Sequence, residues 1–398
     1  MANENPDDVF EKDAVEDDVF YVKDDCVVED SDEDEVSGHG KPIDTKYVCW
    51  TKEFNSELIA LSVHPTFPGI AHVAVGSRDD KCLVVDFAAS NGSSDSKETV
   101  LGPFAETVSC CAYSPDGAYL TLGCMDGLFT AYSCRGGNYE QISTVNGSNE
   151  GIEWISWLQD SSAVMFGGSG HMVYIWDPKA ETSVCISTTD NNSCGKFCSY
   201  NGNNIAVLGG DNGHLSVVRY SNGTVGTVAD VNLHSEIITC VDCHNTVQLA
   251  IAGLYDGGLY FVELSKNTVT ASFLDDHEDT VEDVKFCSGS ESTLAVSIGH
   301  DGKVITWDCE RMVKLHVVLL SERLTRVLWV PSSTVIAASS IFGALFAIKN
   351  GKVIAKNRPH KSTVLDIAAL PCSDREYALL SVSEDGSMMI CQEMFEED

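Results

Sequence analysis

Acidic side chains stand at the start of several short apolar segments of this chain. They are Glu106, Glu153, Glu282, Asp283 and Asp366. Carboxylates that converge on a concave surface bind Lys and Arg, and they bind Arg through two parallel hydrogen bonds. They also raise the rate at which a cationic peptide associates. This pattern predicts a binding site for a basic protein segment.

Three further residues join the predicted site. Asp279 ends the acidic run at 275–279, and Glu384 lies in a turn ahead of an Asp-Gly pair. Trp154 offers an aromatic face to an Arg side chain, although packing in the core is an equally good interpretation. Lys196 and Arg326 occupy corresponding positions in the fourth and seventh repeat units and break the acidic ring. The path of the partner is therefore expected to favour the first, second, third, sixth and eighth units.

Other kinds of chemistry have little support in the sequence. Cys240 and Cys243 have zinc-like spacing, but residues three apart on a strand point to opposite faces, which favours two packed thiols. The Gly-Gly-Ser-Gly run at 167–170 falls in a hairpin and is not a nucleophile elbow. No Gly-rich loop follows a strand and opens a helix. We therefore expect no enzymatic activity, no cofactor and no metal site.

The charge balance narrows the kind of partner. The 398 residues include 25 Lys and Arg against 60 Asp and Glu, a formal net charge of -35. Direct binding to nucleic acid or to an anionic membrane needs a basic surface, so neither is expected. A basic partner such as a histone, a ribosomal protein or a Lys/Arg-rich peptide fits better. The absence of a signal-like start and the scattered cysteines favour the cytoplasm, with the nucleus as a further location. We expect a monomer.

Repeats supply the elements that must position these side chains. About eight units follow Phe54 at a spacing of roughly 39–49 residues, the period of propeller blades. Each reads as three strands, with a turn such as Asp126-Gly127 or Asp301-Gly302 between the second and third. The turn Asp residues are accordingly assigned mainly to structure. A fourth strand between units completes an all-β, eight-bladed propeller, with seven blades left open because the fourth and seventh units are weak.

Two regions are predicted along the chain. Residues 1–45 form a disordered acidic arm, which serves either as a solubilising tail or as a low-specificity contact to a basic partner. Residues 46–398 form the propeller. The last unit lacks an outer strand, and the apolar segment 47–54 is expected to fill that place and to remove an exposed edge.

Two Trp-Asp pairs, Trp176-Asp177 and Trp307-Asp308, close their strands as the WD dipeptide does in WD-repeat propellers. The sixth unit also resembles the hydrogen-bonded structural set of that family. The set consists of His277, Ser297, Asp301 and Trp307. The resemblance implies that these residues stabilise a blade and do not bind a partner.

A narrower resemblance covers the whole ring. The acidic arm, ELIALSVHP, ETVSCCAYSPDGAYL with a downstream CRGG, GIEWISWL, TVEDVKF and TVLDIAAL occur in an order similar to the angio-associated migratory cell protein family. Fungal members of that family are dedicated chaperones of a large-subunit ribosomal protein. The resemblance implies a ring that shields the basic N-terminus of such a client on an acidic face. A scaffold or adaptor for signalling or ubiquitin-ligase complexes, and a histone chaperone, remain the alternatives.

Overall fold

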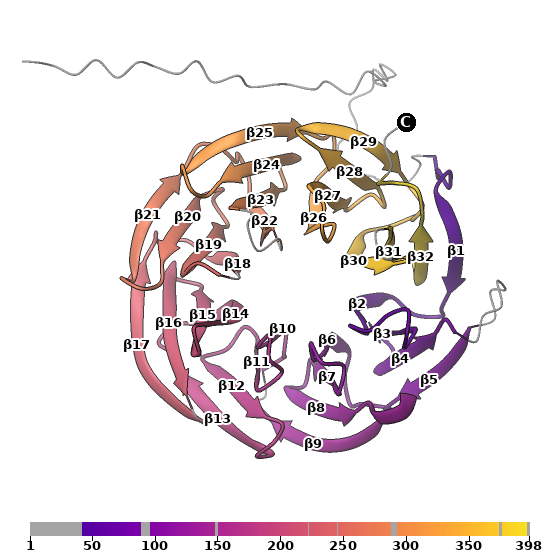
Figure 1. Cartoon of the computed structure of the whole chain (residues 1–398), viewed down its shortest axis with the longest axis horizontal. Helices are drawn as coiled ribbons and strands as arrows, with labels where there is room; N and C mark the ends of the chain where they lie inside the picture. The colour runs from indigo at the N-terminus through magenta and orange to yellow at the C-terminus, as the bar shows by residue number, and fades with distance from the viewer. Residues whose placement is uncertain are drawn as a thin grey trace, which may run out of the picture.

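The computed structural model describes residues 42–88, 96–147, 150–221, 223–244, 246–287, 293–373 and 376–395, so most of the predicted arm lies outside the described residues. Eight four-stranded antiparallel sheets stand around a central opening (Figure 1). The predicted eight-bladed β-propeller is therefore confirmed. Among the residues that the structure describes, no helix is long and apolar enough to cross a membrane.

The first four blades follow one another along the chain, each with its strands ordered from the channel outward. They are β2 (Leu58–Val63), β3 (His72–Ser77), β4 (Lys81–Asp86) and β5 (Lys97–Leu101); β6 (Val108–Tyr113), β7 (Tyr119–Cys124), β8 (Leu128–Ser133) and β9 (Glu140–Asn146); β10 (Trp154–Trp157), β11 (Val164–Gly167), β12 (Met172–Asp177) and β13 (Thr182–Ser187); and β14 (Asn192–Tyr200), β15 (Asn203–Gly210), β16 (His214–Ser221) and β17 (Thr224–Asn232). A short 3-10 turn, η1 (Arg135–Gly137), lies between β8 and β9.

The last four blades repeat the same order. They are β18 (Ile238–Cys243), β19 (Leu249–Leu254), β20 (Leu259–Glu263) and β21 (Thr268–Phe273); β22 (Val281–Phe286), β23 (Leu294–Gly299), β24 (Lys303–Asp308) and β25 (Val313–Leu319); β26 (Leu324–Trp329), β27 (Val335–Ser340), β28 (Leu345–Lys349) and β29 (Lys352–Asn357); and β30 (Val364–Pro371), β31 (Tyr377–Ser383) and β32 (Ser387–Cys391) with β1 (Val48–Glu53).

The outer strand of blade 8 comes from the other end of the described chain. Strand β1 runs antiparallel to β32, with Trp50 opposite Ile390 and Glu53 opposite Ser387. The pairing covers the edge of β32, which would otherwise present free backbone groups to other chains. The ring is thus closed by backbone hydrogen bonds between segments more than 300 residues apart in the sequence.

The turn between the second and third strands of a blade depends on glycine. Gly127 and Gly257 follow an Asp in such turns and have φ values of 81° and 90°. A β-carbon on Gly257 would also come within 2.6 Å of the carbonyl oxygen of His277 in the connection to the next blade. Both the backbone conformation and the contact therefore require glycine. We call the end of the propeller that carries these turns and the blade-to-blade connections the upper face, and the opposite end the lower face.

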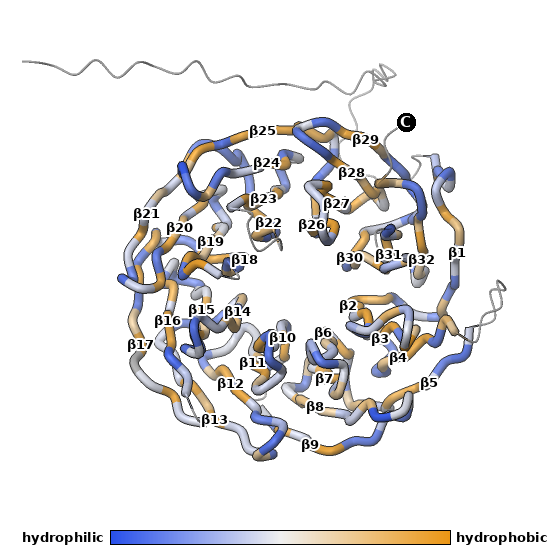
Figure 2. Tube along the Cα trace, in the orientation of Figure 1, coloured by the Kyte–Doolittle hydropathy of each residue, from blue (hydrophilic) through white to orange (hydrophobic). Residues whose placement is uncertain are grey.

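The hydrophobic core lies between adjacent blades. Val207 and Val217 of blade 4 pack with Val241 and Ala252 of blade 5, and comparable clusters join other neighbouring blades. Figure 2 shows these hydrophobic segments in every blade, separated by polar loops. Because each sheet buries both faces against its neighbours, its second and third strands are almost continuously apolar.

The four-residue set of blade 6 forms a connected network. His277 Nε2 lies 2.8 Å from Ser297 Oγ, and His277 Nδ1 lies 3.2 Å from each carboxylate oxygen of Asp301. The indole N–H of Trp307 donates to the same Ser297 oxygen over 2.9 Å. In blade 3 the equivalent indole, Trp176, is buried without a hydrogen-bond partner among the described residues, because Phe166 occupies the place of Ser297.

Candidate functional site at the channel and upper face

A β-bulge near the upper end of the innermost strand decides which side chains reach the channel mouth. In seven of the blades, the pairing between the innermost and the second strand skips one residue of the innermost strand, for example the residue between Val281 and Asp283. The skipped residue, which is Glu282 in blade 6, opposes no residue of the second strand. A bulge re-aims the side chain that it carries. We call this place the bulge position.

At four bulge positions a hydroxyl group joins two blades. The donors Ser109, Ser193, Thr239 and Thr325 each bond to a backbone carbonyl at the start of the next innermost strand. Blades 1 and 8 carry the aliphatic residues Ile59 and Leu365 at this position. Blades 3 and 6 carry Glu153 and Glu282 at the corresponding place. The two carboxylates therefore depart from the hydroxyl and aliphatic residues of the other blades.

Glu153 and Glu282 differ in their surroundings. Glu153 is exposed and accepts a hydrogen bond of 2.6 Å from Ser169 Oγ. Glu282 is half-buried, with His300 Nε2 at 3.3 Å and Arg326 Nη1 at 3.7 Å. Burial raises the pKa of Glu282 and Asp283 adds to the effect, while the two cations oppose it. Glu153 is thus the more available of the two to a cationic partner.

Asp283 and Asp366 occupy a different environment from the one the sequence predicts. Both stand one residue beyond the bulge, and Asp283 is only 6% exposed. Asp283 Oδ2 accepts the backbone N–H of Val327 in blade 7 over 3.1 Å, and Asp366 Oδ2 accepts that of Leu61 in blade 1 over 2.9 Å. Their assignment to partner binding is not supported, because both carboxylates already bond to the backbone of the neighbouring blade.

Asp242, which the sequence analysis did not single out, has the same role at a position two residues further down its strand. Its Oδ2 accepts the backbone N–H of Phe286 in blade 6 over 2.8 Å. Ser62 and Ser156 do the same for blades 2 and 4 with a hydroxyl oxygen. A polar residue in the second half of an otherwise largely apolar innermost strand could have indicated this role. We call Asp242, Asp283 and Asp366 the wall carboxylates.

Basic side chains accompany the wall carboxylates inside the channel. Lys196 Nζ lies 2.9 Å from Asp242, and Lys285 Nζ lies 2.6 Å from Asp283. The side chain of Lys196 is 38% exposed, so the ammonium group faces the channel while its carboxylate partner is buried. Lys196 and Arg326 are not in corresponding positions as predicted: Arg326 aligns with Asp283 and Asp366, whereas Lys196 stands two residues further along.

The wall carboxylates differ in acidity. Burial opposes ionisation of Asp242, but Lys196, Lys285 and two hydrogen bonds outweigh it and hold its pKa below the usual value. Burial raises the pKa of Asp366, and the Arg326 charge together with two backbone N–H groups only partly offsets it. The neighbouring cations therefore stabilise the charged form of Asp242 more effectively than that of Asp366.

Trp154 is held by its neighbours. Its indole N–H donates to the carbonyl oxygen of Asn192 over 3.2 Å, and its ring lies against Gly167 and Gly195 on either side. A β-carbon on Gly195 would come within 2.5 Å of the ring. These contacts support the packing interpretation of Trp154 and leave little of its face for a cation–π contact.

The remaining predicted residues lie on the upper face. Glu106 is exposed and has no hydrogen bond or ion pair with any described residue. Asp279 is half-buried and accepts the backbone N–H of Thr280 over 2.8 Å. Glu384 is exposed and accepts a hydrogen bond of 2.8 Å from Ser362 Oγ. It borders an open depression of about 390 Å³ between blades 8 and 1, and the Glu57–Arg78 ion pair lies in the same depression. We call Glu106, Glu153, Asp279 and Glu384 the rim carboxylates.

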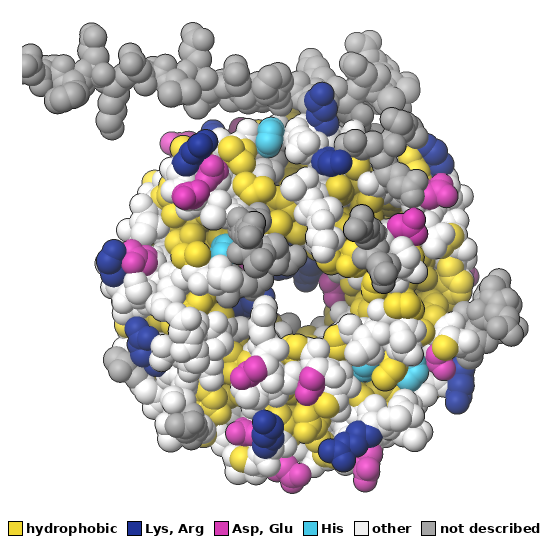
Figure 3. Space-filling view, viewed as in Figure 1, with side chains coloured by type: hydrophobic (Ala, Val, Ile, Leu, Met, Phe, Trp, Pro, Cys, Tyr) yellow, Lys and Arg dark blue, Asp and Glu magenta, His cyan; other side chains and the backbone are white. Residues whose placement is uncertain are grey.

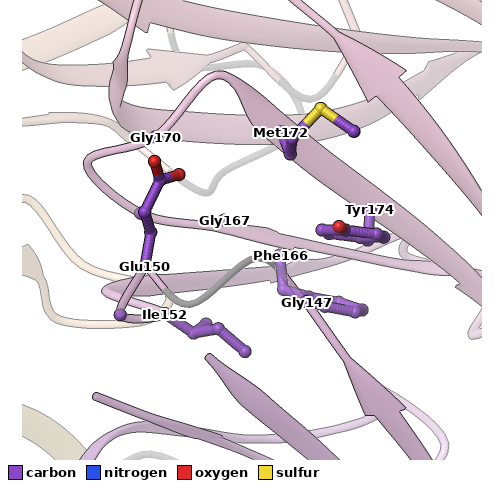
Figure 4. Close-up of a pocket in the computed structure, with 10 residues that line it drawn as sticks. Gly147, Glu150, Ile152, Phe166, Gly167, Gly170, Met172 and Tyr174 are labelled. Atoms are coloured by element: carbon purple, nitrogen blue, oxygen red, sulfur yellow. The ribbon is translucent and has the colours of Figure 1, made fainter. Parts of the chain in front are cut away.

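A smaller cavity lies between blades 2 and 3 on the same face. Figure 4 shows Glu150 pointing toward Gly170, with Met172 and Tyr174 of β12 on the other side. Its volume of about 10 Å³ suffices for a single water molecule. It is too small to take a Lys or Arg side chain.

The channel itself is open. Figure 3, a view onto the lower face, shows basic and acidic side chains inside the central opening. Within the described ranges, no three His, Cys, Asp or Glu side chains are grouped so that they could hold a metal ion. The acidic and basic side chains of this site can bind charged groups.

Comparison with known proteins agrees with the fold. The family model "WD domain, G-beta repeat" matches residues 96–130. Ribosome biogenesis protein YTM1 of Candida glabrata is 23% identical over 71% of this chain and 64% of its own length. The ciliary WD repeat-containing protein ctxp80 of Euplotoides octocarinatus is 27% identical over 42% of this chain, and the match spans only 24% of that relative.

Two solved structures are similar over most of the ring. Sqt1 of Saccharomyces cerevisiae has a TM-score of 0.74 at 14% identity, covering 88% of this chain and 99% of that one. The Dos1 propeller has a TM-score of 0.69 at 13% identity, covering 88% and 96%. At these identities the likeness shows the fold alone. The family model thus shows a WD repeat at residues 96–130, and the two solved structures agree with the propeller fold of the whole ring.

Proposed function

We propose that this WD40-repeat propeller is an assembly chaperone that binds the basic N-terminal segment of a large-subunit ribosomal protein on its upper face. The observation that carries the proposal is the contrast at the channel mouth. Three of the rim carboxylates, Glu106, Glu153 and Glu384, are exposed to solvent, whereas the wall carboxylates are held by the backbone of the next blade. Exposed carboxylates on a chain of net charge -35 favour a cationic ligand.

Two further findings support a ribosomal client. The order of motifs resembles a family whose fungal members are chaperones of such a protein. The chain is also similar, at 23% identity, to a relative named as a ribosome biogenesis protein. A histone chaperone would also require a basic ligand, and a signalling scaffold would not. In this proposal the chain acts by binding and shielding, and carries out no chemical step.

The test uses a synthetic peptide with the basic N-terminal sequence of a large-subunit ribosomal protein. Wild-type protein is expected to bind it with an affinity that falls steeply as salt is raised. The double variant Glu106→Lys/Glu153→Lys is expected to bind about 10- to 100-fold more weakly, because two attractive charges become repulsive. Affinity is measured by fluorescence anisotropy over a range of salt concentrations.

The matched control changes the same amount of charge on the lower face. Glu181 and Glu310 are exposed and lie in turns between third and fourth strands. The double variant Glu181→Lys/Glu310→Lys should bind nearly as tightly as wild type. Equal loss of affinity in both double variants would mean that only net charge matters, and the proposed site would be wrong. A preference for histone tails over the ribosomal peptide would favour the histone chaperone.

A further inference from the structure

One cross-strand pair on the upper face of blade 5 is apolar where the other blades are polar. Tyr255 follows β19 and Ile237 precedes β18, and the Tyr255 N–H donates to the Ile237 carbonyl over 2.9 Å. Tyr255 is 58% exposed and Ile237 is 39% exposed. Two large apolar side chains thus lie in water beside each other, at the mouth of a ring that buries apolar surface efficiently elsewhere.

The strand register places both side chains on one surface. Ile238 and Leu254 are the next pair along the two strands, and both are completely buried. Side chains alternate along a strand, so the preceding pair points to the opposite face of the sheet, where it lies exposed at the upper end of the blade. Directly opposed residues of an antiparallel pair project to the same side. Tyr255 and Ile237 therefore form one small apolar platform, which we call the blade 5 platform.

The repeat provides internal controls for this position. The same backbone hydrogen bond occurs in six other blades, and in each of them at least one of the two residues is polar. The pairs are Glu57 and Arg78, Thr107 and Met125, Asn191 and Asp211, Thr280 and His300, Arg323 and Ile341, and Thr363 and Glu384. By strand register, blade 3 carries Gly151 and Ser169 at these positions. An apolar pair is therefore not required to build a blade.

Two carboxylates flank the blade 5 platform in the sequence. Glu236 precedes Ile237 and Asp256 follows Tyr255 in the sequence, and Asp256 is paired with His234 at 3.1 Å. The turn after Tyr255 also touches the connection to blade 6, where a β-carbon on Gly257 would lie 3.2 Å from the carbonyl oxygen of Asp279. A ligand on this platform would meet apolar surface in its centre, with the Glu236 carboxylate and the His234–Asp256 pair on residues next to it.

We propose that the blade 5 platform binds one large apolar side chain of the client, a residue flanked in its sequence by Lys or Arg. The inference rests on the proposed function, since it assumes a basic segment on the upper face, and it adds a requirement for an apolar anchor. Charge alone attracts any cationic chain, whereas an anchor between charges fixes the register of one segment. Tyr is well suited to such a contact because it buries a large area with few rotatable bonds.

The experiment compares two labelled peptides, KGRLRGK and KGRSRGK, which differ only in the central residue. At low ionic strength, fluorescence anisotropy should show that wild-type protein binds the Leu peptide about tenfold more tightly than the Ser peptide. Tyr255→Ala and, separately, Ile237→Ser should remove most of this difference and leave the affinity for the Ser peptide nearly unchanged. Because both side chains are exposed, these variants should fold normally.

Val228→Ala is the matched control, since Val228 is similarly exposed on the outer strand β17. It should keep the full preference for the Leu peptide. Equal affinity of wild type for the two peptides, with salt-sensitive binding of both, would overturn the anchor and leave the proposed function standing. Failure of both peptides and of the ribosomal N-terminal peptide to bind would overturn the proposed function itself.

Discussion

The rim and the wall of the channel use the same chemical group for opposite purposes. Glu153, at the rim, and Asp283, in the wall, stand one residue apart in the alignment of their innermost strands. Glu153 is exposed and bonds only to a side chain of its own blade, whereas Asp283 is buried and accepts a backbone N–H from the next blade. A shift of one residue at the bulge position thus separates a solvent-exposed carboxylate from a structural one.

The difference follows from what surrounds each oxygen atom. A carboxylate that leaves water loses hydration energy, and it tolerates this loss only when a cation and hydrogen-bond donors replace the water. The wall supplies both, through Lys196 and Lys285 and through backbone N–H groups of neighbouring blades. The rim supplies few of them, so its carboxylates keep their capacity to bind a cationic partner.

The largest effect is expected from removing a wall carboxylate. Asp242→Ala takes the ion-pair partner from Lys196 and the acceptor from the buried Phe286 N–H. We expect the free energy of unfolding to fall by about 2–4 kcal/mol. The loss is limited to this range because water in the channel can hydrate the Lys196 ammonium group. Urea denaturation measures this change in the free energy of unfolding. Glu106→Ala is the rim control, and it should change the free energy of unfolding by less than about 0.5 kcal/mol. Equal effects of the two variants would erase the distinction between wall and rim.

A second prediction separates two members of the wall by pH. The folded pKa of Asp242 lies below its usual 3.8, so its stabilising effect is present above that pH and is lost as the pH falls further. The folded pKa of Asp366 lies above 3.8, so its contribution is largest at low pH and declines as the pH rises through the raised value.

The corresponding variants should therefore respond in opposite directions. Asp242→Asn should become less destabilising as the pH is lowered from 7 toward 3, and Asp366→Asn should become more destabilising. Urea denaturation of both variants and of wild type at a series of pH values measures the two trends. Parallel trends would show that the two carboxylates have the same electrostatic environment.

The smallest effect is expected at the rim. Glu106→Gln/Glu153→Gln removes two negative charges from a chain with a net charge of -35 and breaks no bond to another blade. Relief of repulsion should raise the free energy of unfolding slightly, by about 0.2–0.5 kcal/mol at low salt, and the gain should vanish at high salt. Thermal unfolding at two salt concentrations measures it. A clear loss of stability would place these residues with the wall.

The sequence alone determined the architecture. Period, strand pattern and Asp-Gly turns predicted eight four-stranded blades, because each of these signals is local and recurs in most units. The Trp-Asp pairs likewise pointed to WD-repeat blades, and residues 96–130 match that family model. Composition also limited the kind of partner, since net charge does not depend on how the chain folds.

Only the tertiary structure decided what each acidic residue does. In the sequence, Glu282, Asp283 and Asp366 look alike at the start of an apolar segment, and Trp154 looks as free as any aromatic residue. The bulge, which depends on pairing with the second strand, and the neighbouring blade, which supplies the N–H groups, separate the rim from the wall. Both are contacts between segments distant along the chain, so no local pattern reports them. The exposed pair Ile237 and Tyr255 became visible for the same reason, once the strands that carry it were side by side.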